Sequence, residues 1–194
     1  MTTNQANKSL NQPNAKDPIE LLYTRRLAVR YQKRQLINIR LSEFSERFLL
    51  LHSLILCLVS ITLIGIQIGI FVHKTKLYYT ASGFWMALVF VLCTLTLLIL
   101  RIKRSYGYLM LTLGVHFFAI LSTVGGIILN VFDMAFYNLK CMNACGTFST
   151  QYLNLTIIVF GAMALISVFL FLAAIEYYVL FEAKKLNVYL QNRK

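Results

Sequence analysis

The sequence has few charged residues and few residues that break regular structure. Asp, Glu, Lys and Arg make up 13% of its 194 residues, whereas they make up about a quarter of a soluble domain. Hydrophobic residues reach 58%, so there is too little polar surface to cover a water-soluble globule. The two prolines and nine glycines exclude a collagen-like or a Pro/Gly-rich disordered chain.

Signatures of catalysis are missing as well. The sequence contains no phosphate-binding glycine loop, HExxH metal pair, GxSxG elbow or EF-hand loop. Its seven acidic residues are scattered, and the stretches between the apolar runs are too short for an enzyme domain. We therefore expect neither an enzyme nor a protein with a cofactor.

Four apolar stretches are each long enough to cross a bilayer, whose core of about 30 Å requires roughly 20 helical residues. They cover approximately 48–72, 77–100, 107–132 and 153–181. The sequence predicts an all-α integral membrane protein, a four-helix transmembrane bundle. We expect a disordered tail over 1–16, a basic juxtamembrane helix over 17–47, the transmembrane domain over 48–182 and a tail over 183–194. Without a visible signal peptide, the first span is expected to act as an uncleaved anchor.

The distribution of basic residues predicts the orientation. Most of the 19 lysines and arginines precede the first span, follow the last, or lie between the second and third. Because cytoplasmic loops carry the excess of Lys and Arg, both termini are expected to be cytoplasmic, in the plasma or an endosomal membrane. The net charge of +12 is then explained by topology and by anionic lipids of the inner leaflet, and binding of nucleic acid is not expected.

The basic segment before the first span is predicted to be helical. Asp17 suits an N-cap, Pro18 the first helical position and Glu20 the positive end of the helix dipole. No proline or glycine follows before Gly65, so the helix can run into the first span, with or without a bend. Its apolar and basic residues indicate an amphipathic helix that lies on lipid or docks a partner; topology alone also accounts for its charges. The candidate lipid contacts are Arg25, Arg26, Arg30, Lys33 and Arg34.

Polar side chains inside spans are candidate functional residues. They are His52, Gln67, His116, Asn130 and Glu176. His52, His116 and Glu176 belong to the cytoplasmic half, where a hydrogen bond between a histidine and Glu176 is possible; alternatively, Glu176 extends towards the interface. A channel or transporter needs polar groups across the whole bilayer, and the outer half offers only Gln67 and Asn130.

Glycines indicate where helices approach one another closely. The candidates are Gly65, Gly69, Gly125, Gly126 and Gly161. They can serve packing inside the bundle or contacts in a homo-oligomer, and the sequence does not separate the two.

The outer loops hold a cysteine pair and an acidic residue. Cys141 and Cys145 would lie in an oxidising compartment, so we expect a disulfide between them. No further His or Cys ligand lies beside them, so we expect no metal site. Asp133, at the outer end of the third span, is expected to form an ion pair with one of three lysines: Lys140, Lys74 or Lys76.

Two spans resemble those of a known tetraspan family. The stretch YTASGFWMALVFVLCTLTLLIL (79–100), with Gly83 and Trp85, and GVHFFAILSTVGGIILNVFDM (114–134), with Asp133, resemble the second and third spans of the membrane-spanning 4-domains subfamily A proteins. The four spans and the two cysteines in the second outer loop agree with this resemblance; the looser motifs of MARVEL-type proteins remain an alternative.

The resemblance implies an oligomeric, non-enzymatic surface or endosomal protein that organises receptors or modulates ion flux. We therefore expect a scaffold or accessory subunit that binds other membrane proteins. A small ion channel or transporter subunit with a polar site in the cytoplasmic half is the alternative.

Overall fold

The computed structural model describes residues 18–73, 81–140, 148–185 and 188. Helices account for nearly all of them, and these ranges contain no strand. The helices are α1 (Pro18–Glu43), α2 (Glu46–His73), α3 (Ser82–Ile102), α4 (Tyr106–Lys140) and α5 (Phe148–Ile175), which continues as the π-helix η2 (Glu176–Phe181). The tails over 1–16 and 189–194 lie outside the described residues.

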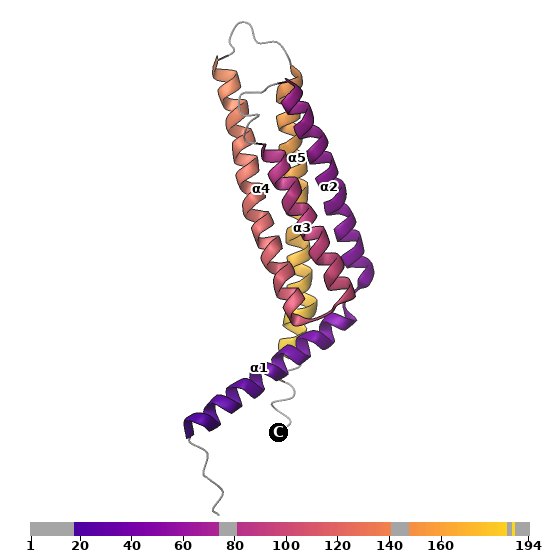
Figure 1. Ribbon diagram of the computed structural model, residues 1–194, viewed down its shortest axis with the longest axis vertical. Coiled ribbons are helices and arrows are strands. Elements are labelled where there is room, and N and C mark those ends of the chain that lie inside the picture. Colours follow the sequence, from indigo (N-terminus) through magenta and orange to yellow (C-terminus); the bar gives the residue numbers. More distant parts are fainter. Residues whose placement is uncertain (1–17, 74–80, 141–147, 186–187, 189–194) are drawn as a thin grey trace, which may run out of the picture.

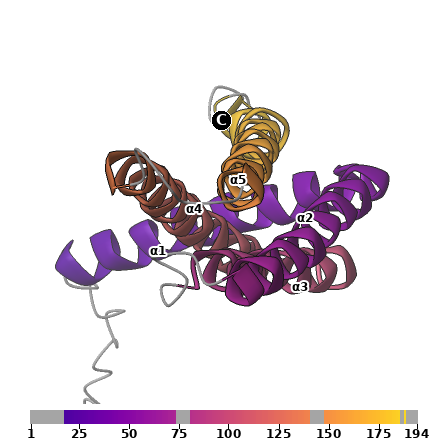
Figure 2. The same ribbon diagram turned by 90° about the horizontal axis from the view of Figure 1, so that it is seen from above.

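Four of these helices are long and apolar enough to cross a membrane, as the sequence predicted. They form one bundle in which α2 packs against α3 and α5, and α4 packs against the same two helices. Figure 2, seen from above, shows this arrangement of α2, α3, α4 and α5. The all-α fold and the four spans fit a multi-pass membrane protein. The end of the bundle at α1 is called the α1 end below, and the opposite end the far end.

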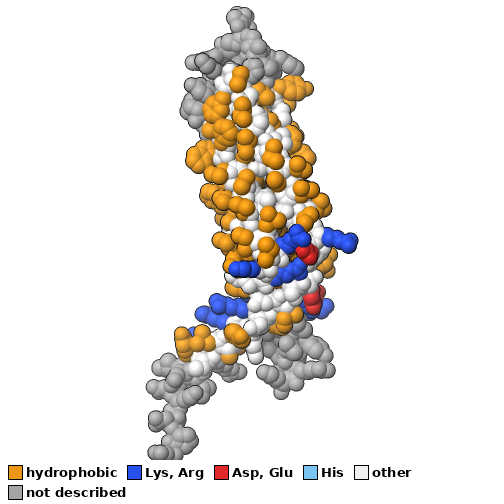
Figure 3. All heavy atoms as spheres, turned by 45° about the vertical axis from the view of Figure 1, so that its right-hand side comes forward, with side chains coloured by type: hydrophobic (Ala, Val, Ile, Leu, Met, Phe, Trp, Pro, Cys, Tyr) orange, Lys and Arg blue, Asp and Glu red, His pale blue; other side chains and the backbone are white. Residues whose placement is uncertain are grey.

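Apolar side chains fill the interior of the bundle and also cover its outside. Leu56, Phe90 and Phe171 are completely buried, whereas Leu170 is 64% exposed. Figure 3 shows hydrophobic side chains along the full length of the bundle, with the Lys, Arg, Asp and Glu side chains in view gathered at the α1 end. This distribution suits lipid as the surrounding solvent, because lipid tails are as apolar as the side chains that face them.

The first two helices meet at a bend rather than forming one continuous helix. α1 ends at Glu43 and α2 begins at Glu46, and the Ser45 hydroxyl accepts the Phe48 N–H at 3.4 Å as an N-cap. Capping of this kind stabilises a helix start, so the chain begins a new helix here without a proline or glycine. Figure 1 shows α1 running away from the bundle below this bend.

Three elements differ from the predicted spans at the far end, and one of them is α5, which begins at Phe148 rather than 153. α4 continues through Asp133 to Lys140, beyond the predicted end at residue 132, because its sequence there contains no proline or glycine. α3 begins at Ser82 rather than 77, after Ala81 in a left-handed conformation with φ 49°. Figure 1 shows its start well inside the end that α2, α4 and α5 reach.

Candidate functional site

A pair of histidines joins α2 to α4 in the interior of the bundle. His52 is 4% exposed and His116 is fully buried, and their Nε2 atoms lie 3.3 Å apart. The other ring nitrogen of His52 lies 3.0 Å from the Ser167 hydroxyl on α5, and that of His116 lies 2.8 Å from the Thr112 carbonyl. This histidine cluster, His52, His116 and Ser167, therefore connects three spans.

The partners fix the direction of each hydrogen bond. A carbonyl only accepts, so His116 Nδ1 carries a proton and donates it to Thr112. An imidazolium inside a span is costly, so His116 is neutral and its Nε2 accepts from His52 Nε2–H. His52 Nδ1 then accepts from the Ser167 hydroxyl. Every nitrogen of the pair has a partner while both rings stay uncharged.

Aromatic packing holds the two rings in place. Phe171 of α5 is fully buried and stacks on His52, with centroids 4.7 Å apart and planes 3° apart. Phe171 also packs against His116, with ring centroids 4.6 Å apart. Phe48 stacks further along at 6.5 Å from both His52 and Phe171. The cluster is thus a packed joint between helices.

Glu176 does not join the histidines. It is exposed and lies beside Ala173, Tyr177 and Lys184 on the outer side of η2. The hydrogen bond between a histidine and Glu176 that the sequence allowed is therefore wrong; the partner of His52 on α5 is Ser167. Ser167 was missed because a serine in an apolar run gives the same sequence signal as any small residue.

Gln67 and Asn130 bind the start of α3. Gln67 Oε1 accepts the Gly83 N–H at 2.8 Å, and Asn130 Nδ2 donates to the Ser82 hydroxyl at 3.0 Å. A Cβ on Gly83 would lie 2.8 Å from Gln67 Oε1, so the glycine permits this close approach. Gln67 thus satisfies a backbone N–H of the first turn of α3, which lacks a partner within the helix, and Asn130 holds the Ser82 side chain of the same turn.

A further polar pair joins α4 to α5 at the far end. Asp133 is 5% exposed and accepts a hydrogen bond of 2.7 Å from Asn154 Nδ2. The side chains of its predicted ionic partners Lys74, Lys76 and Lys140 lie outside the described part of the structure, so that ion pair stays a prediction. The five predicted intramembrane polar residues consequently lie in three places: His52 and His116 at the histidine cluster, Gln67 and Asn130 at the start of α3, and Glu176 on the outer side of η2.

The predicted packing glycines differ in how much space lies beside them. A Cβ on Gly126 would overlap Met86, and one on Gly161 would lie 2.8 Å from Met86 Cε, so both glycines serve packing inside the bundle. Gly69 has ordinary contact with Leu153 at 3.5 Å. Gly65 and Gly125 have open space beside them, on the outside of the bundle.

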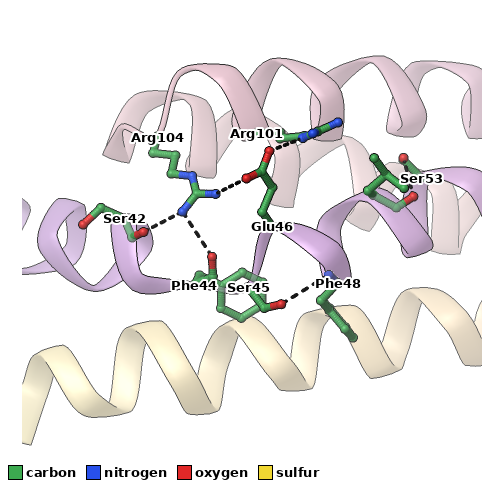
Figure 4. A network of polar contacts seen from close by, with 9 residues as sticks. Ser42, Phe44, Ser45, Glu46, Phe48, Ser53, Arg101 and Arg104 are labelled. Carbon is green, nitrogen blue, oxygen red and sulfur yellow. Dashed lines mark hydrogen bonds and ion pairs between the residues drawn. The ribbon is translucent and has the colours of Figure 1, made fainter.

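α1 is fastened to the loop between α3 and α4 (Figure 4). Arg104 donates to the carbonyls of Ser42 and Phe44, at 2.5 and 3.1 Å, and so caps the end of α1. Glu46 accepts from Arg101 at 2.6 Å and lies 3.9 Å from Arg104. Asn38 accepts the Tyr106 N–H at 2.6 Å, which caps the start of α4. Helix ends on both sides are thus satisfied by the opposite segment.

The predicted lipid-contacting residues occupy the part of α1 beyond this attachment. Arg26, Arg30 and Lys33 are exposed, whereas Ile37 and Leu41 are buried at 2% and 0% exposure. Arg34 is also exposed and holds its guanidinium 5.4 Å from the centre of the Tyr106 ring. The side chain of Arg25 lies outside the described part.

Cys141 and Cys145 lie outside the described residues, so their disulfide stays a prediction. Cys57 and Cys93 are free thiols within α2 and α3. The described part of the chain contains no group of three or more His, Cys, Asp or Glu side chains that could hold a metal ion.

Comparison with known proteins adds no relative. No protein-family model, no curated protein and no solved structure matches the chain. The resemblance to the membrane-spanning 4-domains subfamily A proteins therefore stays a prediction.

Proposed function

We propose that this chain is a non-enzymatic tetraspan protein that scaffolds or modulates partner membrane proteins, as an oligomer or as an accessory subunit. The supporting observation concerns the polar atoms of the interior. Among the described residues, Arg40 Nε is the one buried side-chain nitrogen or oxygen without a hydrogen-bond partner. The interior polar groups hold the spans together, and such bonds between helices stabilise membrane bundles by about 0.6 kcal/mol each.

Partners would then meet the protein on its outer surface. Gly65 and Gly125 lie there with open space beside them, and positions without side chains let another helix approach closely. The same contacts speak against the channel alternative, because Gln67 and Asn130 bind α3 while the histidines bind one another.

The test is purification in native nanodiscs, followed by mass measurement and identification of co-purifying chains. A larger mass made of several copies, or a stoichiometric second membrane protein, supports the proposal. A lone monomer that conducts ions after reconstitution contradicts it and favours the channel. Gly65→Leu and Gly125→Leu should lower the assembled fraction, whereas Val124→Leu, beside Gly125 and 42% exposed, should not.

The basic part of α1 would contact the anionic lipids of the inner leaflet. Arg26, Arg30, Lys33, Ile37 and Leu41 follow one another at spacings of three and four residues, which places them on one face of α1. The apolar members of this stripe dock on the bundle, and the basic members continue the same face beyond it. That face would then be turned towards the headgroups around the bundle. The excess of Lys and Arg at this end would place both termini in the cytoplasm.

Hydrogen exchange in nanodiscs tests this contact between α1 and anionic lipid. Phosphatidylserine should slow exchange over 26–34 relative to neutral lipid, and Arg26, Arg30 and Lys33 changed together to Gln should abolish the effect. At about 1 kcal/mol for each basic residue, the three contribute a roughly hundredfold preference. Lys184→Gln with Lys185→Gln removes exposed charge elsewhere and should leave the slowing intact. Equal exchange in both lipids would contradict the proposed contact.

A further inference from the structure

A groove of about 760 Å³ opens at the α1 end, between the bend that joins α1 to α2 and the end of α5. Figure 1 shows the end of α5 reaching α1 at this place, and α1 packs against η2 there. Four aromatic side chains line the groove: Phe44, Phe48, Tyr177 and Tyr178. The two tyrosines come from the π-helix, a widened turn that is frequent at functional sites.

The four rings are set at steep angles to one another. Phe48 and Phe44 have centroids 5.6 Å apart and planes at 89°. Phe44 and Tyr178 lie 6.4 Å apart at 62°, and Tyr178 and Tyr177 lie 5.1 Å apart at 89°. Successive rings therefore differ in the direction of their faces within the groove that they line. The negative face of an aromatic ring attracts a quaternary ammonium group.

The charges in the groove add to this preference. Glu43 and Glu182 supply two carboxylates and Arg40 one guanidinium, so the lining is net negative in a chain of net charge +12. A positive group is favoured in the groove and a purely anionic headgroup is not. Arg40 Nη1 donates to Glu43 at 2.7 Å, and the Arg40 side chain is 30% exposed. The guanidinium carries further N–H donors, so its exposed part has capacity left for an anionic oxygen.

The position of the groove indicates that its ligand is a membrane lipid. Its lining changes from the charged side chains of α1 to Phe48 and Ala174, which belong to two spans. An amphiphile enters such a site from the bilayer, with its head among the charges and its chains along the spans.

We propose that this groove binds the headgroup of a choline phospholipid. The trimethylammonium group lies against the aromatic rings and beside Glu182, and the phosphate lies at Arg40. This inference does not depend on the proposed scaffolding function.

Competition between two phospholipids tests the proposal. The delipidated full-length protein in mild detergent is mixed with equal amounts of phosphatidylcholine and phosphatidylethanolamine of identical chains, and retained lipid is counted by native mass spectrometry. The headgroups differ in three methyl groups, which strengthen the contact with the rings. We expect a roughly tenfold preference for phosphatidylcholine. Equal retention would overturn the proposal.

Variants distinguish this groove from other lipid contacts. Tyr178→Ala removes one wall and Glu182→Gln one charge, and each should reduce the preference several-fold; Glu182→Gln keeps the size of the side chain if the first variant fails to fold. Tyr178→Phe should retain the preference. Phe169→Ala removes a 55% exposed ring elsewhere on α5 and should change nothing. An unchanged preference in both Tyr178→Ala and Glu182→Gln, or retention of soluble phosphocholine as tight as that of phosphatidylcholine, would overturn the lipid site in the groove.

Discussion

Removing one histidine of the cluster is expected to be more destabilising than removing both. In His116→Leu, His52 Nε2–H loses its acceptor in a place where His52 is 4% exposed. An unpaired buried donor costs about 1–3 kcal/mol. In the double variant with His52→Leu, both polar rings are replaced by apolar side chains that pack on Phe171, and Ser167 can bond a carbonyl of its own helix. Replacing both partners can be nearly neutral.

The free energy of unfolding decides the question. It is measured by titrating the protein in mixed micelles with SDS and following helical circular dichroism, for both single variants and the double variant. We expect a loss of about 2 kcal/mol for His116→Leu and a smaller loss for the double variant. The coupling, which is the sum of the two single losses minus the double loss, should therefore exceed about 2 kcal/mol. The adjacent Phe117→Leu is the control, since Phe117 is 62% exposed. If the double variant lost as much stability as the two single variants together, the hydrogen bond between the rings would be refuted, and packing would be the only remaining interaction between them.

Two other predictions concern packing and the attachment of α1. Gly126→Val should lower the free energy of unfolding by about 1–3 kcal/mol, because its side chain overlaps Met86, whereas the neighbouring Gly125→Val has open space and should have little effect in the same SDS titration. Arg104→Gln should speed hydrogen exchange over 36–44 about fivefold, since capping bonds of about 1 kcal/mol are lost. Lys103→Gln should not, because the Lys103 side chain lies over the Tyr108 ring and its cap at the end of α3 is made by the backbone N–H. Equal losses of stability in Gly126→Val and Gly125→Val would contradict the packing contact assigned to Gly126. Equal exchange rates in Arg104→Gln and Lys103→Gln would contradict the caps assigned to Arg104.

The fold was predictable because each span follows from its own local composition. A run of some twenty apolar residues has to become a helix in lipid, since each backbone polar group must be satisfied within the segment. The polar stretch at 73–76 and the charged stretch from Arg101 to Arg104 are equally local signals. The sequence could not give the start of α3, because that start depends on Gln67 and Asn130 of other helices.

The partners within the candidate site were less predictable. His52 and His116 were recognised as ionisable residues in spans, but their meeting depends on how α2 and α4 are rotated, which no local pattern encodes. The same rotation turns Gly126 inward and its neighbour Gly125 outward. Asn38 and Arg104 were missed because a side chain that caps a helix distant in sequence looks like any other polar residue of a basic segment.

The contacts at the two ends of the bundle suggest different degrees of mobility. At the far end, α3 is held by buried amides from α2 and α4, and Asp133 ties α4 to α5. At the α1 end, the polar part of the attachment consists of caps and of ion pairs. The ion pairs are made by Glu46, whose side chain is 54% exposed. Exposed ion pairs are worth little, so α1 is held mainly by its buried apolar residues and by two caps. A ligand that occupies the groove would touch α1, the bend and α5 together, and would therefore stabilise this attachment more than any other part of the fold.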